Sequence, residues 1–291
     1  MKTQKRAYLY AISAVLLWST AASAFKLTLR YTVVLPLLLY SSLVSLIVFF
    51  AALLFQGKFI LLRSCTRQDI LISMSTGFLN PFLYYVVLFK AYSMLPAQQA
   101  MTLNYTWPVM LVILSIPLLR QKITVRSFGA IILSFCGVIV IGTQGNITSL
   151  RFSSPTGVLL ATGSSVIWSF FWIFNIRDNR DEIVKLFLGF LFGTVFIVVF
   201  SQLASGIKLP CFPSVFGMIY IGLFEMGITF ILWLKALKLS DTTARVGNLV
   251  YLSPFLSLFF IHIVVGETIA ITTFIGLVMI MSGIVLQQKA N

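Results

Sequence analysis

The amino-acid sequence predicts an all-α membrane protein with ten transmembrane helices, arranged as two inverted five-helix repeats. Three observations predict this fold class: a strongly apolar composition, recurring long apolar segments, and a second half that repeats features of the first. Of the 291 residues, 59% are hydrophobic and only 10% are charged. Soluble domains carry about 25% charged residues, so this chain lacks the charge to cover a water-facing surface.

Ten apolar segments lie between charged or turn-rich breaks, and segments of about 20 apolar residues are typical of helices that cross a bilayer. They are expected at residues 8–28, 33–55, 70–89, 97–119, 127–144, 157–176, 184–204, 213–234, 246–265 and 269–287. The basic start and Ala22-Ser23-Ala24 also fit a cleaved secretory signal, but the repeat described below favours a retained first helix. The connections are short, so no soluble domain is expected.

Lysine and arginine are unevenly distributed between the two sets of alternate connections. One set, which includes both termini, carries 16 of them. The other set carries five: Lys26, Arg30, Lys90, Arg151 and Lys208. Because positive residues accumulate on the cytoplasmic side, this bias predicts a multi-pass protein of the cell inner (plasma) membrane with both termini in the cytoplasm. An error of one span would destroy the alternation, so the bias also favours ten spans.

The net charge of +14 does not indicate a nucleic-acid partner. The basic residues occur in twos and threes between apolar stretches, rather than in a patch with interleaved aromatic residues. Cys65, Cys136 and Cys211 follow no metal-binding or disulfide spacing, so neither a metal nor a cofactor is expected. The expected partner of the apolar and basic surface of this chain is the lipid bilayer.

The two halves of the chain, residues 1–146 and 147–291, share matches in the same order. Matches at shifts of 145 to 150 positions pair Trp18-Ser19 with Trp168-Ser169, Gly77 with Gly222, Lys90-Ala91 with Lys235-Ala236, Pro108 with Pro254, Gln121 with Glu267 and Gly137 with Gly283. Each half holds five spans, an odd number, so the second half enters the membrane from the opposite face. Inverted repeats of this kind are typical of alternating-access transporters, whose substrate site lies near the bilayer midplane.

The segments from Lys90 to Gly137 and from Lys235 to Gly283 resemble the paired repeat of the drug/metabolite transporter superfamily, of the EamA type. The second half is the closer match, with Ala236-Leu237-Lys238, the mid-helix Pro254 and Gly266-Glu267; the first half has Arg120-Gln121 at the last position. The run "LNYTWPVM", Leu103 to Met110, is similar to exporters of aromatic amino acids in that superfamily. The resemblance implies a secondary transporter that exports small amphipathic metabolites, with amino acids including aromatic ones among the candidates.

Polar side chains inside the hydrocarbon region are costly and tend to face cavities or partners. Helical spacing places Asn80 and Tyr84 of the third span on one face, and the repeat shift superposes Asn80 on Glu225. Glu225 is the only acidic residue near the centre of a span, which favours a role in proton coupling or as the counter-charge of a substrate ammonium. A neutral or paired carboxyl that only holds helices together is the alternative.

Other spans add aromatic and amide residues to the predicted substrate site: Trp18, Tyr105, Trp107, Trp168, Asn248 and Tyr251. Tyr105 lies in a polar arc beside Pro108, which can bend the helix. On an ideal helix Trp107 points away from that arc, so its inclusion depends on the resemblance and on a kink. Trp168 belongs to an aromatic stripe, which by itself is more typical of packing or lipid contact.

Two further features are interpreted as structural. Gly189 and Gly193 form a Gly-x-x-x-Gly face, typical of close helix pairing, which makes a homodimer a candidate assembly. Tyr8, Tyr10 and Trp233 lie near span ends and suit the aromatic belts at the membrane interfaces.

These features favour one of three classes of function. A secondary transporter of a small-molecule substrate accounts for the inverted repeat and for the polar residues near midplane. A membrane-embedded enzyme needs clustered acids or histidines, whereas this chain has one histidine, His262, and one midplane acid, so no enzyme is expected. The remaining alternative is a non-transporting structural or assembly membrane protein.

Overall fold

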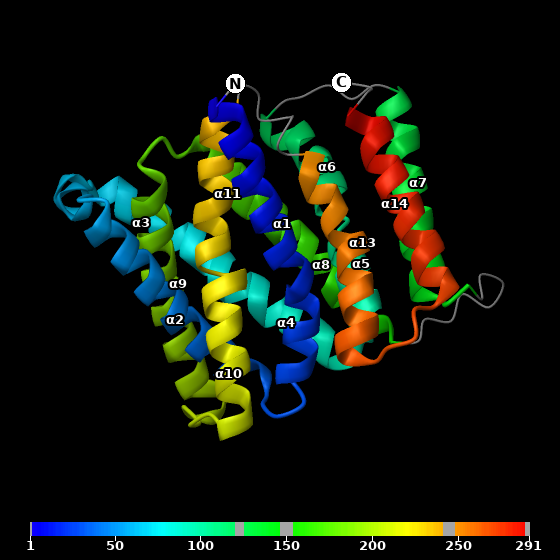
Figure 1. Cartoon of the computed structure of the whole chain (residues 1–291), viewed down its shortest axis with the longest axis horizontal. Helices are drawn as coiled ribbons and strands as arrows, with labels where there is room; N and C mark the ends of the chain where they lie inside the picture. Colours follow the sequence, from blue (N-terminus) through cyan, green and yellow to red (C-terminus); the bar gives the residue numbers. More distant parts are fainter. Residues whose placement is uncertain (1, 120–124, 146–153, 241–247, 289–291) are drawn as a thin grey trace.

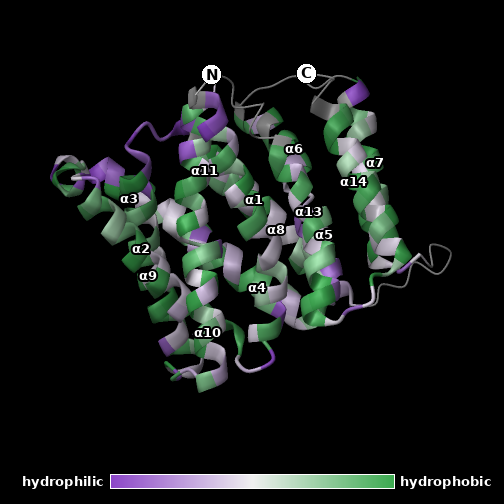
Figure 2. Cartoon of the chain, viewed as in Figure 1, coloured by the Kyte–Doolittle hydropathy of each residue, from purple (hydrophilic) through white to green (hydrophobic). Residues whose placement is uncertain are grey.

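The computed structural model describes residues 2–119, 125–145, 154–240 and 248–288, and all regular structure in them is helical (Figure 1). The start of α1 (Lys2–Thr28) and the end of α14 (Ile271–Gln288) lie at the same edge of the bundle, at the top of Figure 1. Hydrophobic residues cover most of the helical length, and hydrophilic residues gather towards the helix ends (Figure 2). Arg120, Gln121 and Arg151, which enter the expected topology and repeat, lie outside the described residues.

Seven helices in the described residues are long and apolar enough to cross a bilayer. They are Gln4–Thr28, Val34–Phe55, Arg67–Met94, Ala97–Leu118, Pro155–Asn175, Glu182–Ser205 and Phe212–Leu239. Three shorter apolar helices accompany them: Phe128–Gly142, Leu249–Val265 and Ile271–Leu286. A helix needs about 20 residues to span the hydrocarbon core, so the chain is a multi-pass integral membrane protein.

Four of the seven long membrane helices run unbroken: α1, α2 (Val34–Phe55), α8 (Pro155–Arg177) and α9 (Glu182–Ser205). Four apolar runs are composite, as follows: α3 (Arg67–Gly77), η2 (Phe78–Leu83) and α4 (Tyr84–Met94); α5 (Ala97–Asn104) and α6 (Trp107–Leu119); α10 (Phe212–Tyr220), η3 (Ile221–Glu225) and α11 (Ile228–Leu239); η4 (Asn248–Leu252), α13 (Ser253–Phe260) and η5 (Ile261–Val265). The short η1 (Phe59–Ser64) follows α2, and α7 (Val125–Gly142) packs against α14.

Two helices continue past the expected ends of their spans. The lysines Lys90 and Lys235 set these ends at residues 89 and 234, whereas the helices continue to Met94 and Leu239. A lysine marks the edge of the hydrocarbon region rather than the end of a helix, because its long stem lets the ammonium reach the headgroups. Pro96, whose ring cannot continue an α-helix, follows the true end of α4.

Glycines allow α3 and η2 to pack closely against α9. A Cβ atom on Gly77 of α3 would overlap the backbone carbonyl of Gly189 on α9, and one on Gly193 would overlap the ring of Pro81. The Gly-x-x-x-Gly face therefore packs within the chain, so its interpretation as a dimer face is wrong. Gly222 approaches α2 in the same way, where a Cβ would lie 2.6 Å from the carbonyl oxygen of Ser41.

Ion pairs join two parts of the chain at the connection between α8 and α9. Lys58 Nζ lies 2.8 Å from Asp181 Oδ2, and Arg180 lies 2.5 Å from Asp178 and 3.7 Å from Asp69. Burial is the largest single influence on Asp181 and opposes its charge, but the hydrogen bond from Lys58, those from the backbone and the charge of Lys58 together lower the pKa of this carboxyl below its ordinary value. These pairs hold the end of α2 and the start of α3 against the α8–α9 connection.

Candidate functional site

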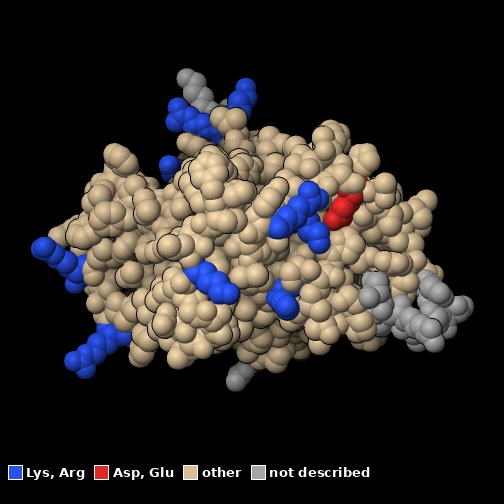
Figure 3. Space-filling view, turned by 90° about the horizontal axis from the view of Figure 1, so that it is seen from below, with Lys and Arg blue, Asp and Glu red and all other residues tan. Residues whose placement is uncertain are grey.

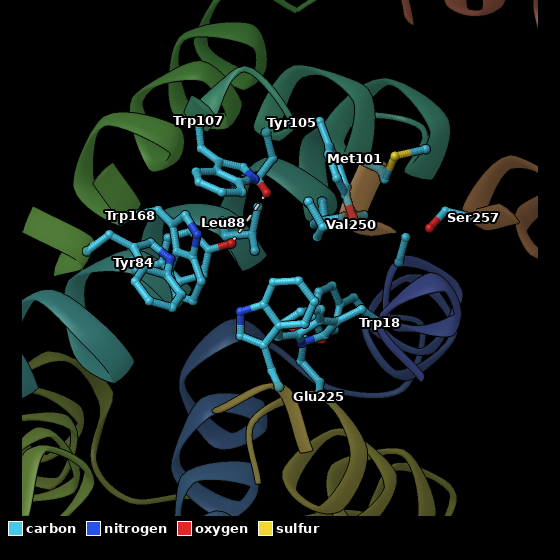
Figure 4. A pocket seen from close by; sticks show the side chains of 17 residues that line it. Trp18, Tyr84, Leu88, Met101, Tyr105, Trp107, Trp168, Glu225, Val250 and Ser257 are labelled. Atoms are coloured by element: carbon cyan, nitrogen blue, oxygen red, sulfur yellow. Dashed lines mark hydrogen bonds between the residues drawn. The ribbon is translucent and has the colours of Figure 1, made fainter. Parts of the chain in front are cut away.

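A cavity of about 100 Å³ lies between helices of the bundle (Figure 4). Helices from both halves of the chain enclose it: α1, α4, α5 and α6 from the first, and α8, η3, α11, η4 and α13 from the second. All five tryptophans of the chain line it: Trp18, Trp107, Trp168, Trp172 and Trp233. Tryptophan is usually enriched at membrane interfaces, so its concentration in one interior cavity indicates a binding site.

The rings of the cavity pack on one another and keep one another in place. The ring centroids of Trp168 on α8 and Tyr84 on α4 lie 4.7 Å apart. The ring centroid of Trp172, one turn later on α8, lies 6.0 Å from that of Trp168. On the other side, Trp18 of α1 lies 5.4 Å from Trp233 of α11. These separations are typical of favourable aromatic pairs, and the rigid walls they form suit recognition of an apolar or aromatic body.

Glu225 is the single acidic residue among the described residues that line the cavity. It is the last residue of η3, where the helix from Phe212 to Leu239 is interrupted before α11. Its Oε1 atom accepts a hydrogen bond from Tyr85 at 3.2 Å, and its Oε2 atom is buried with no described partner. In Figure 4 it lies across the cavity from Tyr105 and Trp107. A buried carboxyl with a free oxygen can bind a proton or a cationic group.

A hydrogen-bond network turns Trp107 towards the cavity. The α5 helix ends at Asn104, which accepts from Tyr84 at 3.3 Å and donates to Ser164 Oγ at 2.8 Å. Ser169 Oγ donates to the carbonyl oxygen of Trp107 at 2.9 Å. These bonds hold the break between α5 and α6 against α8, so Trp107 does not follow the face that an unbroken helix would give it.

Six of the nine residues predicted for the substrate site line this cavity: Trp18, Tyr84, Tyr105, Trp107, Trp168 and Glu225. Tyr251 is not among the lining residues and packs against the apolar core instead. The side chain of Asn248 lies outside the described residues. The sequence features that correctly predicted lining residues were therefore the aromatic residues and the acidic residue near the centre of a span.

Asn80 does not reach the cavity, contrary to the prediction. It lies in a separate small recess with Thr76 and Lys185, and its side-chain atoms are buried without a described partner. Its backbone is non-helical, with φ −146° and ψ 120°, so the helical spacing that placed it beside Tyr84 does not hold across this residue. The face of a helix cannot be followed through such a break.

Two of the tryptophans that line the cavity were missed by the sequence interpretation. Trp172 lies four residues after Trp168, and this spacing, which places both on one face of the helix, was the signal that could have found it. Trp233 was assigned to the interfacial belt, which is wrong, because only 7% of its surface is exposed and it packs on Trp18. The shared preference of tryptophan for interfaces and for binding sites explains the second error.

A set of polar contacts, here called the polar clasp, joins the two halves of the chain at the edge of the bundle away from the termini. Glu267 accepts hydrogen bonds from the backbone N–H groups of Ala97 at 2.8 Å and Gln98 at 3.3 Å, in the first turn of α5. Gln98 Oε1 in turn accepts from the N–H of Ala270 at 2.8 Å. A carboxylate is stabilised at a helix N-terminus, so this contact joins the first half of the chain to the second. Seen from this edge, the surface carries only scattered charges (Figure 3).

Thiol labelling tests whether the cavity becomes accessible to water. In a background that lacks Cys65, Cys136 and Cys211, Trp18→Cys is expected to react with a small cationic methanethiosulfonate. Leu16→Cys is the matched control, because Leu16 lies on the same helix at nearly the same depth, 47% exposed on the outer surface of the bundle. We expect Trp18→Cys to react roughly tenfold faster or more, since a thiol in lipid rarely forms the reactive thiolate. Equal rates would show that the cavity is not part of an aqueous path.

Comparison with known proteins places the chain among transporters. The EamA-like transporter family matches residues 5–143 and again residues 155–287. The aromatic amino acid exporter YddG of Ancylobacter novellus is 25% identical over 88% of this chain and 87% of its own. The uncharacterized transporter YoaV of Bacillus subtilis is 22% identical over 94% and 93%. An uncharacterized transporter of Clostridium kluyveri is 26% identical over 60% of this chain, which spans 58% of that protein.

A solved crystal structure has the same fold. It aligns over 98% of both chains with a TM-score of 0.69 and 22% identity. This likeness concerns the arrangement of the helices alone.

Proposed function

The chain belongs to the EamA-like transporter family, and we propose that it is a secondary transporter that exports small amphipathic metabolites by alternating access. The observation that carries this proposal is the aromatic cavity with its single carboxyl, Glu225, enclosed by helices of both halves. Transporters built from inverted repeats bind their substrates near midplane, at the interface of the repeats. Aromatic amino acids belong to the proposed range, because one relative is named as their exporter.

We infer that ten transmembrane helices form two inverted units, residues 1–146 and 147–291. Seven long and three shorter apolar helices in the described residues together support a total of ten. The start of α1 and the end of α14 lie at the same edge of the bundle, which supports an even number of membrane crossings (Figure 1). The family matches each half separately, which supports the boundary between the units. The break at η2 also corresponds, after the shift of 145 positions, to the break at η3.

Contacts between the halves support the repeat, because shifts of 145 to 150 positions convert each such contact into a corresponding one. Ser19 Oγ lies 3.2 Å from Ser253 Oγ, and the corresponding Ser169 Oγ donates to the backbone of Trp107. In the same way α3 packs on α9, while its counterpart α10 packs on α2. Such an exchange is what two similar units related by a two-fold axis in the membrane plane would produce.

Flux in proteoliposomes tests the transport proposal. Vesicles with the purified full chain are expected to show saturable flux of at least one compound from a panel of amino acids and aromatic cations. Trp168→Ala should reduce this flux roughly tenfold, since a buried aromatic contact contributes about 1 kcal/mol beyond its buried area. Leu159→Ala on the same helix is the control, because Leu159 is 72% exposed on the outer surface of the bundle. No flux above protein-free vesicles for the whole panel would favour the structural or assembly alternative.

Reporter fusions test the orientation. We propose an inner (plasma) membrane protein with both termini in the cytoplasm, as the 16-to-5 distribution of basic residues favours. Fusions after Gln144 and after Asn291 should therefore report opposite sides of the membrane. The same side for both would contradict the inverted arrangement.

A further inference from the structure

The charge balance of the cavity distinguishes classes of substrate. Nine of its seventeen lining residues are aromatic, and Glu225 is the one charged residue that the described lining contains. Lys26 follows the lining residue Phe25 on α1, but its ammonium donates to the backbone carbonyls of Leu95 at 2.6 Å and Tyr92 at 3.0 Å. The described part of the wall therefore offers a negative group and many ring faces, but no positive group.

Such a wall attracts cations in two ways. The carboxylate of Glu225 has one oxygen without a described partner, and an ion pair is strongest where water is excluded. The faces of tryptophan and tyrosine carry negative charge density and attract ammonium groups, tryptophan most strongly. Trp18 and Trp168, on opposite halves of the repeat, both line the same cavity as the carboxyl.

A zwitterion brings a second charge that this wall does not balance. The carboxylate of an amino acid would lose water on entry, and burying an unpaired charge is costly. The indole N–H of Trp172 is buried without a described partner, so it can donate to a neutral hydroxyl or carbonyl. One neutral donor does not compensate a buried carboxylate.

We propose that the substrates of this cavity are singly charged aromatic amines and similar amphipathic cations, preferred over zwitterionic amino acids of the same ring. This substrate class rests on the proposed transport function. The ammonium is held between Glu225 and the ring faces, and the apolar body fills the remaining aromatic space. The neutral donor Trp172 accommodates an uncharged polar substituent.

Binding to the purified full chain, followed by its tryptophan fluorescence, tests the class with one matched series. The probes are phenethylamine, its N,N,N-trimethyl derivative, phenylalanine and 3-phenylpropionate, which share a phenyl ring and differ in charge. We expect both cations to bind roughly tenfold more tightly than phenylalanine, and 3-phenylpropionate more weakly still. Glu225→Gln should remove the difference between the cations and phenylalanine. Glu182→Gln should keep it, because Glu182 is paired with Lys185 outside the cavity.

The wild-type series decides the outcome even if Glu225→Gln does not fold. Phenylalanine binding as tightly as phenethylamine would overturn the proposal, and so would the absence of binding by either cation. If either of these results is found while proteoliposomes still show flux of amino acids, the substrate class is rejected and the proposed transport function is retained. The trimethyl derivative has a permanent positive charge and no N–H group. Its tight binding would therefore show that the preference depends on charge rather than on hydrogen bonding.

Discussion

Glu225→Gln is expected to abolish the stimulation of export by a pH gradient with the acidic side outside. A midplane carboxyl that is exposed alternately to the two compartments can take up a proton on one side and release it on the other. Glutamine keeps the size and hydrogen bonding of this side chain, including the contact with Tyr85, but cannot titrate. The ratio of flux with a gradient to flux without one should therefore fall to unity in the variant.

The measurement compares wild type and variant at matched protein levels, each at a saturating substrate concentration. Saturation separates loss of coupling from weaker substrate binding. Glu182→Gln is the matched control, since it removes an acid at the α8–α9 connection, outside the cavity. Equal gradient stimulation in wild type and Glu225→Gln would reject a coupling role for this residue. An unstimulated wild type would indicate facilitated transport.

Gly77→Ala is expected to prevent normal packing of α3 against α9. The added Cβ atom would overlap the backbone of Gly189, and backbone atoms cannot swing aside as the end of a flexible side chain can. Forcing extra volume into a packed contact costs about 1–3 kcal/mol, and more when backbone must move. Thermal unfolding of the purified protein in detergent should show a clear loss of stability or of folded material.

Gly163→Ala is the matched control for this substitution. Gly163 also lies within a membrane helix, α8, but a Cβ at this position would meet no atom within 4 Å. Alanine there should leave stability unchanged or raise it by up to about 1 kcal/mol, because alanine has the higher helix propensity. Equal destabilisation by the two substitutions would mean that the Gly77 contact is not closely packed.

The sequence by itself was sufficient to determine the all-helical membrane class and the family resemblance. Apolar segments must be about 20 residues long to cross a bilayer, so composition and spacing carry that information directly. It also identified Glu225 and five aromatic residues that line the cavity, because a midplane charge and unusual aromatic residues stand out in an aliphatic background. The orientation and the two-unit division are still predictions from charge bias and repeat.

Only the tertiary structure decided which predicted side chains meet. Asn80 leaves the expected face because the helix is interrupted at that residue, and Trp107 is turned towards the cavity by the interruption between α5 and α6. Helical spacing is a local rule, and each interruption changes the direction of all the side chains that follow. Trp233 and Gly193 were misassigned for a related reason: a ring near a span end or a small residue suits lipid, a partner chain or a neighbouring helix equally well. The choice depends on which helix packs alongside, and that is a property of the whole fold.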